Sequence, residues 1–183
     1  MDPERLVRAS KFLSRHLRHR PDRLGLTLEA GGWVRVGDLL AAAARHGFPI
    51  TPAELDEVVA RNDKQRFSFD ATGTRIRANQ GHSIPVDLRL ESVEPPALLY
   101  HGTGGRTALA IEREGLRKMR RHHVHLSADP ETARRVGARH GRPVVFEVDA
   151  AAMRAAGYRF FRSANGVWLV DAVPPRYLRR GCG

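Results

Sequence analysis

The chain has 183 residues, of which 42% are hydrophobic and 28% charged, so it can bury a core and is not compositionally disordered. It contains no apolar run of the roughly 18 residues needed to cross a bilayer, and its first residues lack the apolar stretch of a secretory signal. Its one cysteine, Cys182, excludes an internal disulfide framework and a cysteine-based zinc site. We therefore expect a cytoplasmic protein that has no membrane segment.

The charge balance is strongly basic. Arginine and lysine number 31 against 20 acidic residues, which gives a formal net charge of +11 with histidine neutral. This excess favours a polyanionic partner, most simply a nucleic acid. Most of the cations are arginines, however, and an arginine bias can also reflect the base composition of a genome. The positions of the cations are therefore more informative than their number.

The first part of the chain has the pattern of three helices followed by a β-hairpin, which is typical of a winged-helix domain. Apolar residues at helical spacing predict the helices, and Thr51 with Glu54 forms a capping box at the start of the third. Pro21 should end the first helix near His19. The expected elements are helices over 6–19, 36–46 and 51–60, a short strand over 26–28, and hairpin strands over 67–69 and around Ile76.

Residues 79–96 are polar, contain three prolines, and are expected to form a connection. Beyond them the pattern is rich in short strands, and Asn165-Gly166 is a strong hairpin signal. We expect an α+β protein with domains over 1–92 and 93–183. The elements expected after the connection are strands over 97–100, 124–126, 144–148, 158–161 and 167–170, and helices from about 107 to Gly115 and from Asp129-Pro130 onward.

A cluster of basic residues marks the end of the first helix, where Arg15, His16 and Arg18 are followed by further cations and only one acid. One interpretation is a solvated helix end with a half-buried histidine. The other is a phosphate-binding clamp, because guanidinium groups match phosphate oxygens in pairs. His16 lies in the last helical turn, where the helix dipole favours the imidazolium ion. A cationic histidine would suit phosphate binding or proton donation.

Two further segments could bind a ligand. Residues 117–125 contain three histidines and several cations but no acid, so a zinc site is disfavoured and a basic loop facing a bound anion is expected. Residues 101–105, His-Gly-Thr-Gly-Gly, predict a glycine-rich turn that lets the backbone approach a ligand closely. This turn matches neither a Walker loop nor the dinucleotide fingerprint.

Five blocks of the sequence, taken in order, resemble the signature blocks of the NAD-dependent RNA 2′-phosphotransferases, the KptA family. The resemblance extends from about Ser10 to Leu178 and implies two lobes. The first would be a winged-helix lobe that binds RNA, and the second an ADP-ribosyltransferase-like lobe with a mostly antiparallel split sheet that binds NAD. The blocks are residues 13–19, 62–67, 77–83, 100–103 and 124–127.

The resemblance also implies a reaction. An internal RNA 2′-phosphate attacks the nicotinamide ribose of NAD and expels nicotinamide. The ribose hydroxyl of the resulting RNA-2′-phospho-ADP-ribose then attacks phosphorus, giving 2′-hydroxyl RNA and ADP-ribose 1″,2″-cyclic phosphate. NAD would be consumed as a co-substrate, with no metal. The expected substrate is a tRNA, in tRNA splicing or RNA repair, and the protein is expected to be a monomer.

The resemblance assigns roles to individual residues. Arg120 stays open as an alternative to Arg121, and the step that His16 serves also stays open. The assigned residues are Arg15, His16, Arg66 and Arg121 for catalysis, His101, Gly102, Thr103, His125 and Ser127 for NAD, and Arg18, Asn79, Gln80, Gly81 and His82 for the RNA substrate.

The residue types agree with this chemistry. The late strand 167–170 has no carboxylate, which fits a phosphate nucleophile, because a phosphomonoester is mostly dianionic at pH 7 and needs no general base. Arginines would stabilise the negative charge that builds at phosphorus. Two alternatives remain at this stage. One is an ADP-ribosyltransferase that caps 5′-phosphorylated nucleic-acid ends or modifies protein, and the other is a non-enzymatic winged-helix DNA-binding ligand sensor.

Overall fold

A computed structural model describes residues 1–61, 64–119 and 121–181. The chain divides into two compact units, Met1–Arg89 and Leu90–Gly183. Both units mix helices with strands, and every strand pairing among the described residues is antiparallel, which confirms the α+β class. Asn62, Asp63, Arg120 and Cys182, which the sequence patterns include, lie outside the described residues.

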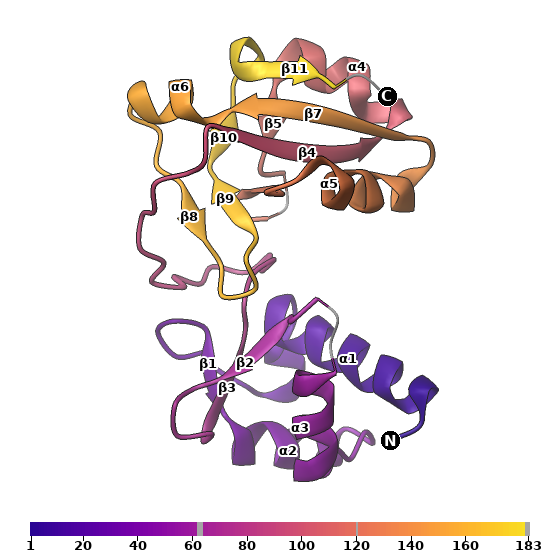
Figure 1. Ribbon diagram of the computed structural model, residues 1–183. Helices are drawn as coiled ribbons and strands as arrows, with labels where there is room; N and C mark the ends of the chain where they lie inside the picture. The colour runs from indigo at the N-terminus through magenta and orange to yellow at the C-terminus, as the bar shows by residue number, and fades with distance from the viewer. Residues whose placement is uncertain (62–63, 120, 182–183) are drawn as a thin grey trace. The chain divides into compact units, whose positions relative to one another are not determined.

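Three helices and a small sheet build the N-terminal unit, as expected (Figure 1). The Asp2 carboxylate caps the first helix by accepting a hydrogen bond from the backbone of Arg5 at 2.7 Å. The capping box at Thr51 and Glu54 is confirmed, with both of its hydrogen bonds formed. The elements are α1 (Pro3–Arg18), η1 (Pro21–Leu24), β1 (Trp33–Arg35), α2 (Val36–Arg45), α3 (Pro52–Ala60), β2 (Phe67–Phe69) and β3 (Arg75–Ala78).

The sheet of this unit has the order β1-β3-β2, and the expected hairpin forms its β2–β3 half. The strand expected over 26–28 is wrong. Gly25 takes a left-handed conformation, with φ at 66°, at the end of η1. The backbone N–H of Leu26 then turns back to the carbonyl of Pro21 instead of joining a strand. Residues 26–28 therefore close a turn.

The apolar stripe of α1 lies in the core of the N-terminal unit. Ala9, Leu13 and Leu17 are completely buried and pack with Leu39 of α2 and Leu55 of α3, among others. Burial of each such leucine contributes roughly 1.5–3 kcal/mol. The opposite side of α1 is thereby left for its cationic residues.

The C-terminal unit contains two three-stranded sheets that meet at a single residue pair. Tyr100 and Ser127 exchange backbone hydrogen bonds of 2.9 and 2.7 Å, which link the sheet β11-β7-β4 to the sheet β6-β9-β8. Strands β10 and β5 form a separate pair. The elements are β4 (Leu98–Gly104), α4 (Gly105–Glu114), β5 (Leu116–Arg117), β6 (Val124–Leu126), α5 (Pro130–Gly137), η2 (Ala138–His140), β7 (Pro143–Asp149), α6 (Ala150–Ala155), β8 (Phe161–Arg162), β9 (Trp168–Val170), β10 (Ala172–Val173), η3 (Pro175–Tyr177) and β11 (Leu178–Arg180).

The glycine-rich segment after residue 100 is a strand, so the expected turn there is wrong. Gly102 and Gly104 pair with β7 inside β4. A Cβ atom built on Gly102 would lie only 1.6 Å from the carbonyl oxygen of Ala133 in α5. The glycines therefore let the backbone of α5 lie directly on β4, where Figure 1 shows the helix. These glycines therefore have a packing role, and a contact of Gly102 with NAD stays a prediction.

The hairpin expected at Asn165-Gly166 is confirmed between β8 and β9. Its loop has three residues, because the backbone N–H of Ser163 donates to the carbonyl of Val167 at 2.9 Å. The strand expected over 158–161 is shorter at its start, since the backbone N–H of Tyr158 is taken by Met153 at the end of α6. Among the described residues, no helix is long and apolar enough to cross a membrane.

Candidate functional site

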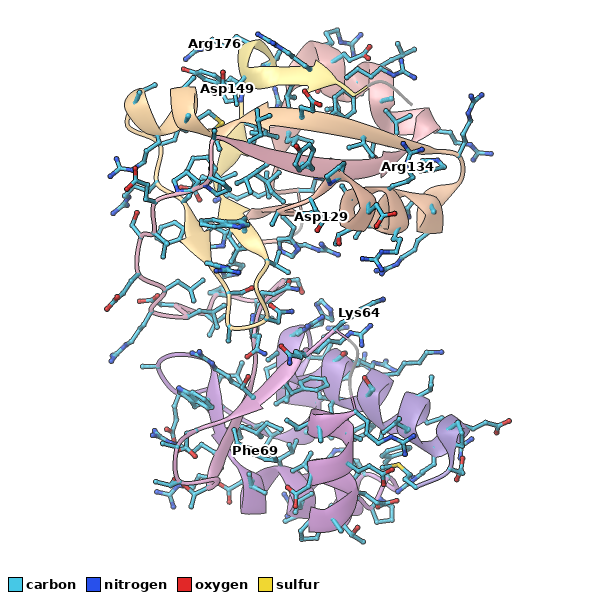
Figure 2. The ribbon with its side chains drawn as sticks, viewed as in Figure 1. Lys64, Phe69, Asp129, Arg134, Asp149 and Arg176 are labelled. Carbon is cyan, nitrogen blue, oxygen red and sulfur yellow. The ribbon has the colours of Figure 1, made fainter. Side chains whose placement is uncertain are left out.

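The N-terminal unit contains a cationic hollow of about 600 Å³, here called the Arg18 hollow. Helix α1 supplies one wall, and the segment that enters β2 supplies another, with Lys64 at its start as labelled in Figure 2. Among the described residues, no aspartate or glutamate lines this hollow. Such a set of cations suits phosphate groups, which guanidinium groups bind in pairs. The cations that line it are Lys11, Arg15, Arg18, Arg61, Lys64 and Arg66.

The segment after β3 fixes the end of α1 at the edge of this hollow. The backbone N–H of Ser83 donates to the carbonyl of Arg18 at 3.0 Å, and Nδ1 of His19 lies 2.9 Å from the Ser83 hydroxyl. Gly81, with φ at 86°, lies against the guanidinium of Arg18, and a Cβ atom there would be 3.5 Å from Nη1. The structure thus brings the predicted residues Arg18 and Gly81 into contact.

Asn79 connects the same segment to Arg66. Its backbone N–H donates to the carbonyl of Arg66 at 2.8 Å, and its side-chain Nδ2 donates to the carbonyl of Gln65 at 2.6 Å. Asn79 is only 3% exposed, so it can influence a bound ligand only indirectly, by fixing the position of Arg66. His82 is also almost completely buried and lies beside Gly32. Gln80 is partly buried.

His16 faces a different hollow, here called the His46 hollow, and does not line the Arg18 hollow. It is 8% exposed, and its Nδ1 lies 2.9 Å from the carbonyl oxygen of Phe12. Burial lowers the pKa of His16, and the nearby charges of Arg15, His46 and Arg23 lower it further. Burial therefore opposes the helix dipole, which favours the imidazolium form of His16.

His19 is the functional candidate that sequence reasoning did not select. It lines the Arg18 hollow together with Arg15, Arg18 and Arg66. The signal was present, since His19 directly follows Arg18 in the same sequence block. The sequence predicted that the helix ends near His19, but it could not reveal that the His19 ring contacts Ser83, which is 64 residues away.

In the C-terminal unit, three predicted residues form a hydrogen-bonded chain. Nδ1 of His101 lies 3.0 Å from the carbonyl oxygen of His125, and Arg121 donates from Nη1 to Nδ1 of His125 at 3.0 Å. Burial lowers the pKa of His101, although the hydrogen bond to His125 opposes the shift. A carbonyl oxygen only accepts, so Nδ1 of His101 carries the proton and the neutral ring has its lone pair on Nε2.

The remaining predicted residues lie on or beside β4. Thr103 is two residues after His101, on the same face of the strand. Its hydroxyl lies 2.6 Å from that of Thr107 in α4. Ser127 pairs with Tyr100 through the backbone and precedes α5, whose first turn is capped by Asp129 (Figure 2). His101, Thr103 and Ser127 are thus positioned around the junction of the two sheets.

The histidines of residues 122–125 do not converge. His125 contacts Arg121, whereas His123 packs against Phe161 and lies 4.0 Å from the carboxylate of Asp171. In the described part of the chain, no three His, Cys, Asp or Glu side chains are grouped so that they could ligate a metal.

Comparison with known proteins gives the class of this protein. Residues 4–172 match the family described as RNA 2′-phosphotransferase, Tpt1 / KptA family. A protein of Streptomyces coelicolor named "Probable RNA 2′-phosphotransferase" is 63% identical over 179 residues, which cover 98% of this chain and 97% of that protein. Proteins of the same name from Trichormus variabilis and Burkholderia pseudomallei are 62% and 52% identical over 178 and 173 residues. These alignments cover 97% and 94% of this chain, and 98% and 94% of the two relatives.

The chain is therefore a transferase that acts on RNA. It belongs to the RNA 2′-phosphotransferase, Tpt1 / KptA family, whose members remove 2′-phosphate groups from RNA.

Proposed function

We propose that the protein removes an internal 2′-phosphate from RNA by transferring it to NAD, giving 2′-hydroxyl RNA, ADP-ribose 1″,2″-cyclic phosphate and nicotinamide. The observation that carries this proposal is the Arg18 hollow, where several cations surround a space with no described carboxylate. In this proposal residues 1–92 are a winged-helix lobe that binds RNA. Residues 93–183 are an ADP-ribosyltransferase-like lobe that binds NAD.

The 2′-phosphate is bound by Arg15, Arg18 and Arg66. A phosphomonoester carries close to two negative charges at pH 7, and paired guanidinium donors match its oxygens. The backbone contact from Asn79 supports the position of Arg66, and Gly81 lies against the guanidinium of Arg18. The substrate expected for such a site is a tRNA in which splicing has left an internal 2′-phosphate.

The NAD site lies on the C-terminal lobe around His101, Thr103 and Ser127. Hydroxyl groups and a neutral imidazole suit the ribose hydroxyls and the carboxamide of NAD. NAD supplies an activated C1–N bond. In the first step a 2′-phosphate oxygen forms a bond to that carbon, the bond to nitrogen breaks, and its electrons leave with nicotinamide. No proton has to be removed from the phosphate.

In the second step a ribose hydroxyl forms a bond to phosphorus and releases its proton to solvent. The bond from phosphorus to the RNA 2′-oxygen breaks, and that oxygen takes up a proton from the protein. Arg66 and Arg121 stabilise the charge on the phosphoryl oxygens. We assign the proton donor to His19, because His19 lines the Arg18 hollow and His16 does not. The lowered pKa of His16 also disfavours a proton-donating role for that residue.

Incubation with NAD and an oligonucleotide that carries one internal 2′-phosphate tests this function. Nicotinamide, cyclic phosphate and 2′-hydroxyl RNA should appear in equal amounts, and the matched 2′-hydroxyl oligonucleotide should release no nicotinamide. RNA that stays ADP-ribosylated would instead indicate a one-step transferase. Tight nucleic-acid binding without NAD consumption would indicate a ligand sensor.

A further inference from the structure

The His46 hollow, on the N-terminal unit, is not used by the mechanism above. It has a volume of about 540 Å³, within the range of small-molecule sites. Three elements line it. Helix α1 supplies Lys11, Phe12, Arg15 and His16, η1 supplies Arg23 and Leu24, and His46 follows the last residue of α2.

The polar groups of this hollow are all cations or histidines. Lys11, Arg15 and Arg23 line it, and no aspartate or glutamate among the described residues does so. The two histidine rings are fixed in the same way, since Nδ1 of His16 and of His46 each lies 2.9 Å from a carbonyl four residues earlier. Each Nδ1 therefore carries a hydrogen, and Nε2 is the other polar atom of each ring. Nε2 of each neutral ring therefore presents a lone pair, so it is the three cations and not the two histidines that favour an anion here.

The floor of the hollow is apolar and partly aromatic. The ring of Phe12 stacks on that of Phe48, with centroids 4.5 Å apart and an interplanar angle of 13°. The same ring lies 4.3 Å from that of His16, and Leu24 is completely buried beside them. A ligand that carries both an anionic group and a flat aromatic surface would satisfy both parts of the hollow. A nucleotide is such a ligand, because its base stacks and its phosphate binds cations.

The two hollows adjoin on α1. Lys11 and Arg15 line both of them, so a strand bound in one can continue directly into the other. Lys11 and Arg18 are seven residues apart, which corresponds to roughly 10 Å along the helix. Residues seven apart lie on the same face of a helix, so the two hollows open on one face of α1.

We propose that the His46 hollow is a second RNA subsite, which binds a nearby nucleotide of the strand whose 2′-phosphate lies in the Arg18 hollow. Its phosphodiester contacts Arg23, and its base packs on Phe12 beside the ring of His46. This proposal rests on the proposed function, because that function places RNA in the adjoining hollow. It predicts that the protein distinguishes a long RNA strand from a short one.

Equilibrium binding in the absence of NAD tests the proposal independently of catalysis. The probes are a dinucleotide and a hexanucleotide, each with one internal 2′-phosphate, the hexanucleotide extended on both sides. Arg23→Ala and His46→Gln are the diagnostic variants, since both residues are exposed and line only the His46 hollow. The preference of wild-type protein for the hexanucleotide should fall about tenfold in Arg23→Ala, as for the loss of one charge-assisted contact, and should fall less in His46→Gln.

Salt dependence gives a second measurement. The slope of log affinity against log salt for the hexanucleotide should be shallower by about 0.7 in Arg23→Ala, as expected when one phosphate contact is lost from a single strand. Arg8→Ala is the matched control. Arg8 lies on α1, which lines both hollows, but its own side chain lines neither. That variant removes the same charge and should keep the wild-type preference and slope.

Two outcomes would overturn the proposal. One is a hexanucleotide preference that is the same in wild-type protein, Arg23→Ala and His46→Gln, or that is absent from all three. The other combines two results. Inorganic phosphate stabilises wild-type protein but not Arg23→Ala, and the length preference is the same in both proteins. That result would make the hollow a site for inorganic phosphate. Failure of the proposed function is distinguishable, since it appears as no consumption of NAD while these binding differences persist.

Discussion

Nδ1 of His19 lies 2.9 Å from the hydroxyl oxygen of Ser83, and the backbone N–H of Ser83 donates to the carbonyl of Arg18 at 3.0 Å. One residue therefore contacts both members of the Arg18-His19 pair. The pair belongs to the end of α1, whereas Ser83 belongs to the segment after β3, so the fold of the whole N-terminal unit determines where the two side chains lie.

Ser83→Ala should reduce kcat about fivefold, because a net hydrogen bond of about 1 kcal/mol that orients the ring of His19 is lost. KM should change less than kcat, and the pH profile of kcat should shift. Ser83→Thr keeps a hydroxyl group and should restore most of the activity. An equal loss in both variants, or a loss that follows only the melting temperature, would contradict this role.

His19 and His16 can be separated by substitution. His19→Gln should lower the rate of product formation by about 10²-fold or more, as expected for a general acid, with little change in stability since the side chain is exposed. His16→Ala should lower the free energy of unfolding by about 1–3 kcal/mol, because the residue is buried and bonded to Phe12. Steady-state kinetics and urea denaturation measure the two effects. A His16 variant that is as stable as wild-type protein but inactive would show that His16, and not only His19, is needed for catalysis.

Arg66→Ala should allow ADP-ribosylated RNA to accumulate, because the second step concentrates negative charge on the phosphoryl group. Gel analysis with labelled RNA detects the intermediate directly. Arg75→Ala removes an arginine from β3, outside the Arg18 hollow, and should not cause accumulation. Normal turnover of Arg66→Ala without any intermediate would remove Arg66 from the second step.

Gly102→Ala should destabilise the protein by at least about 3 kcal/mol. The new methyl group would lie 1.6 Å from the carbonyl oxygen of Ala133, so α5 would have to move away from β4. Gly37→Ala is the control, because Gly37 lies in α2 with no neighbouring atom within 4 Å of the added Cβ. That substitution should instead stabilise the protein by about 0.5–1 kcal/mol. Chemical denaturation of both variants gives the comparison.

Asp70→Asn should change the pH dependence of stability. Burial alone would raise the pKa of Asp70, but hydrogen bonds from the side chain and backbone of Arg75 and from Thr72 lower it to about 2. The carboxylate therefore stabilises the folded state above its unfolded pKa near 3.8, and this contribution is lost as the pH falls toward 2. Wild-type protein should be the more stable at pH 7, and the difference should vanish near pH 2. A difference that is independent of pH would contradict this account.

Local sequence signals predicted the elements that local interactions determine. The capping box at Thr51 and the hairpin at Asn165-Gly166 involve neighbouring residues, and both are confirmed. Short strands depend on distant partners, which explains why residues 26–28 were assigned wrongly. Helix α6 was also missed, although the Asp149 carboxylate caps it through a local hydrogen bond from Ala152. The α+β class and the family also followed from the sequence.

Within the candidate site, the sequence located the cations but not the side of α1 that each one faces. His16 and His19 are three residues apart in one basic cluster, and sequence reasoning selected His16. Their difference arises from the exact end of α1 and from packing against Phe12 and His46, both of which depend on the tertiary structure. Whether His101, Thr103 and Ser127 bind NAD remains a prediction from the family resemblance.

The close seating of α5 on β4 has a consequence for redesign of this protein. Positions 102 and 104 must stay bare, since a methyl group at either would collide with the backbone of residue 133 or 140. His101 and Thr103, which alternate with these glycines along β4, point to the opposite face of the strand. They can be substituted without contacting α5. Substitution along this part of β4 is therefore confined to alternating positions, because the glycine positions between them accept no side chain.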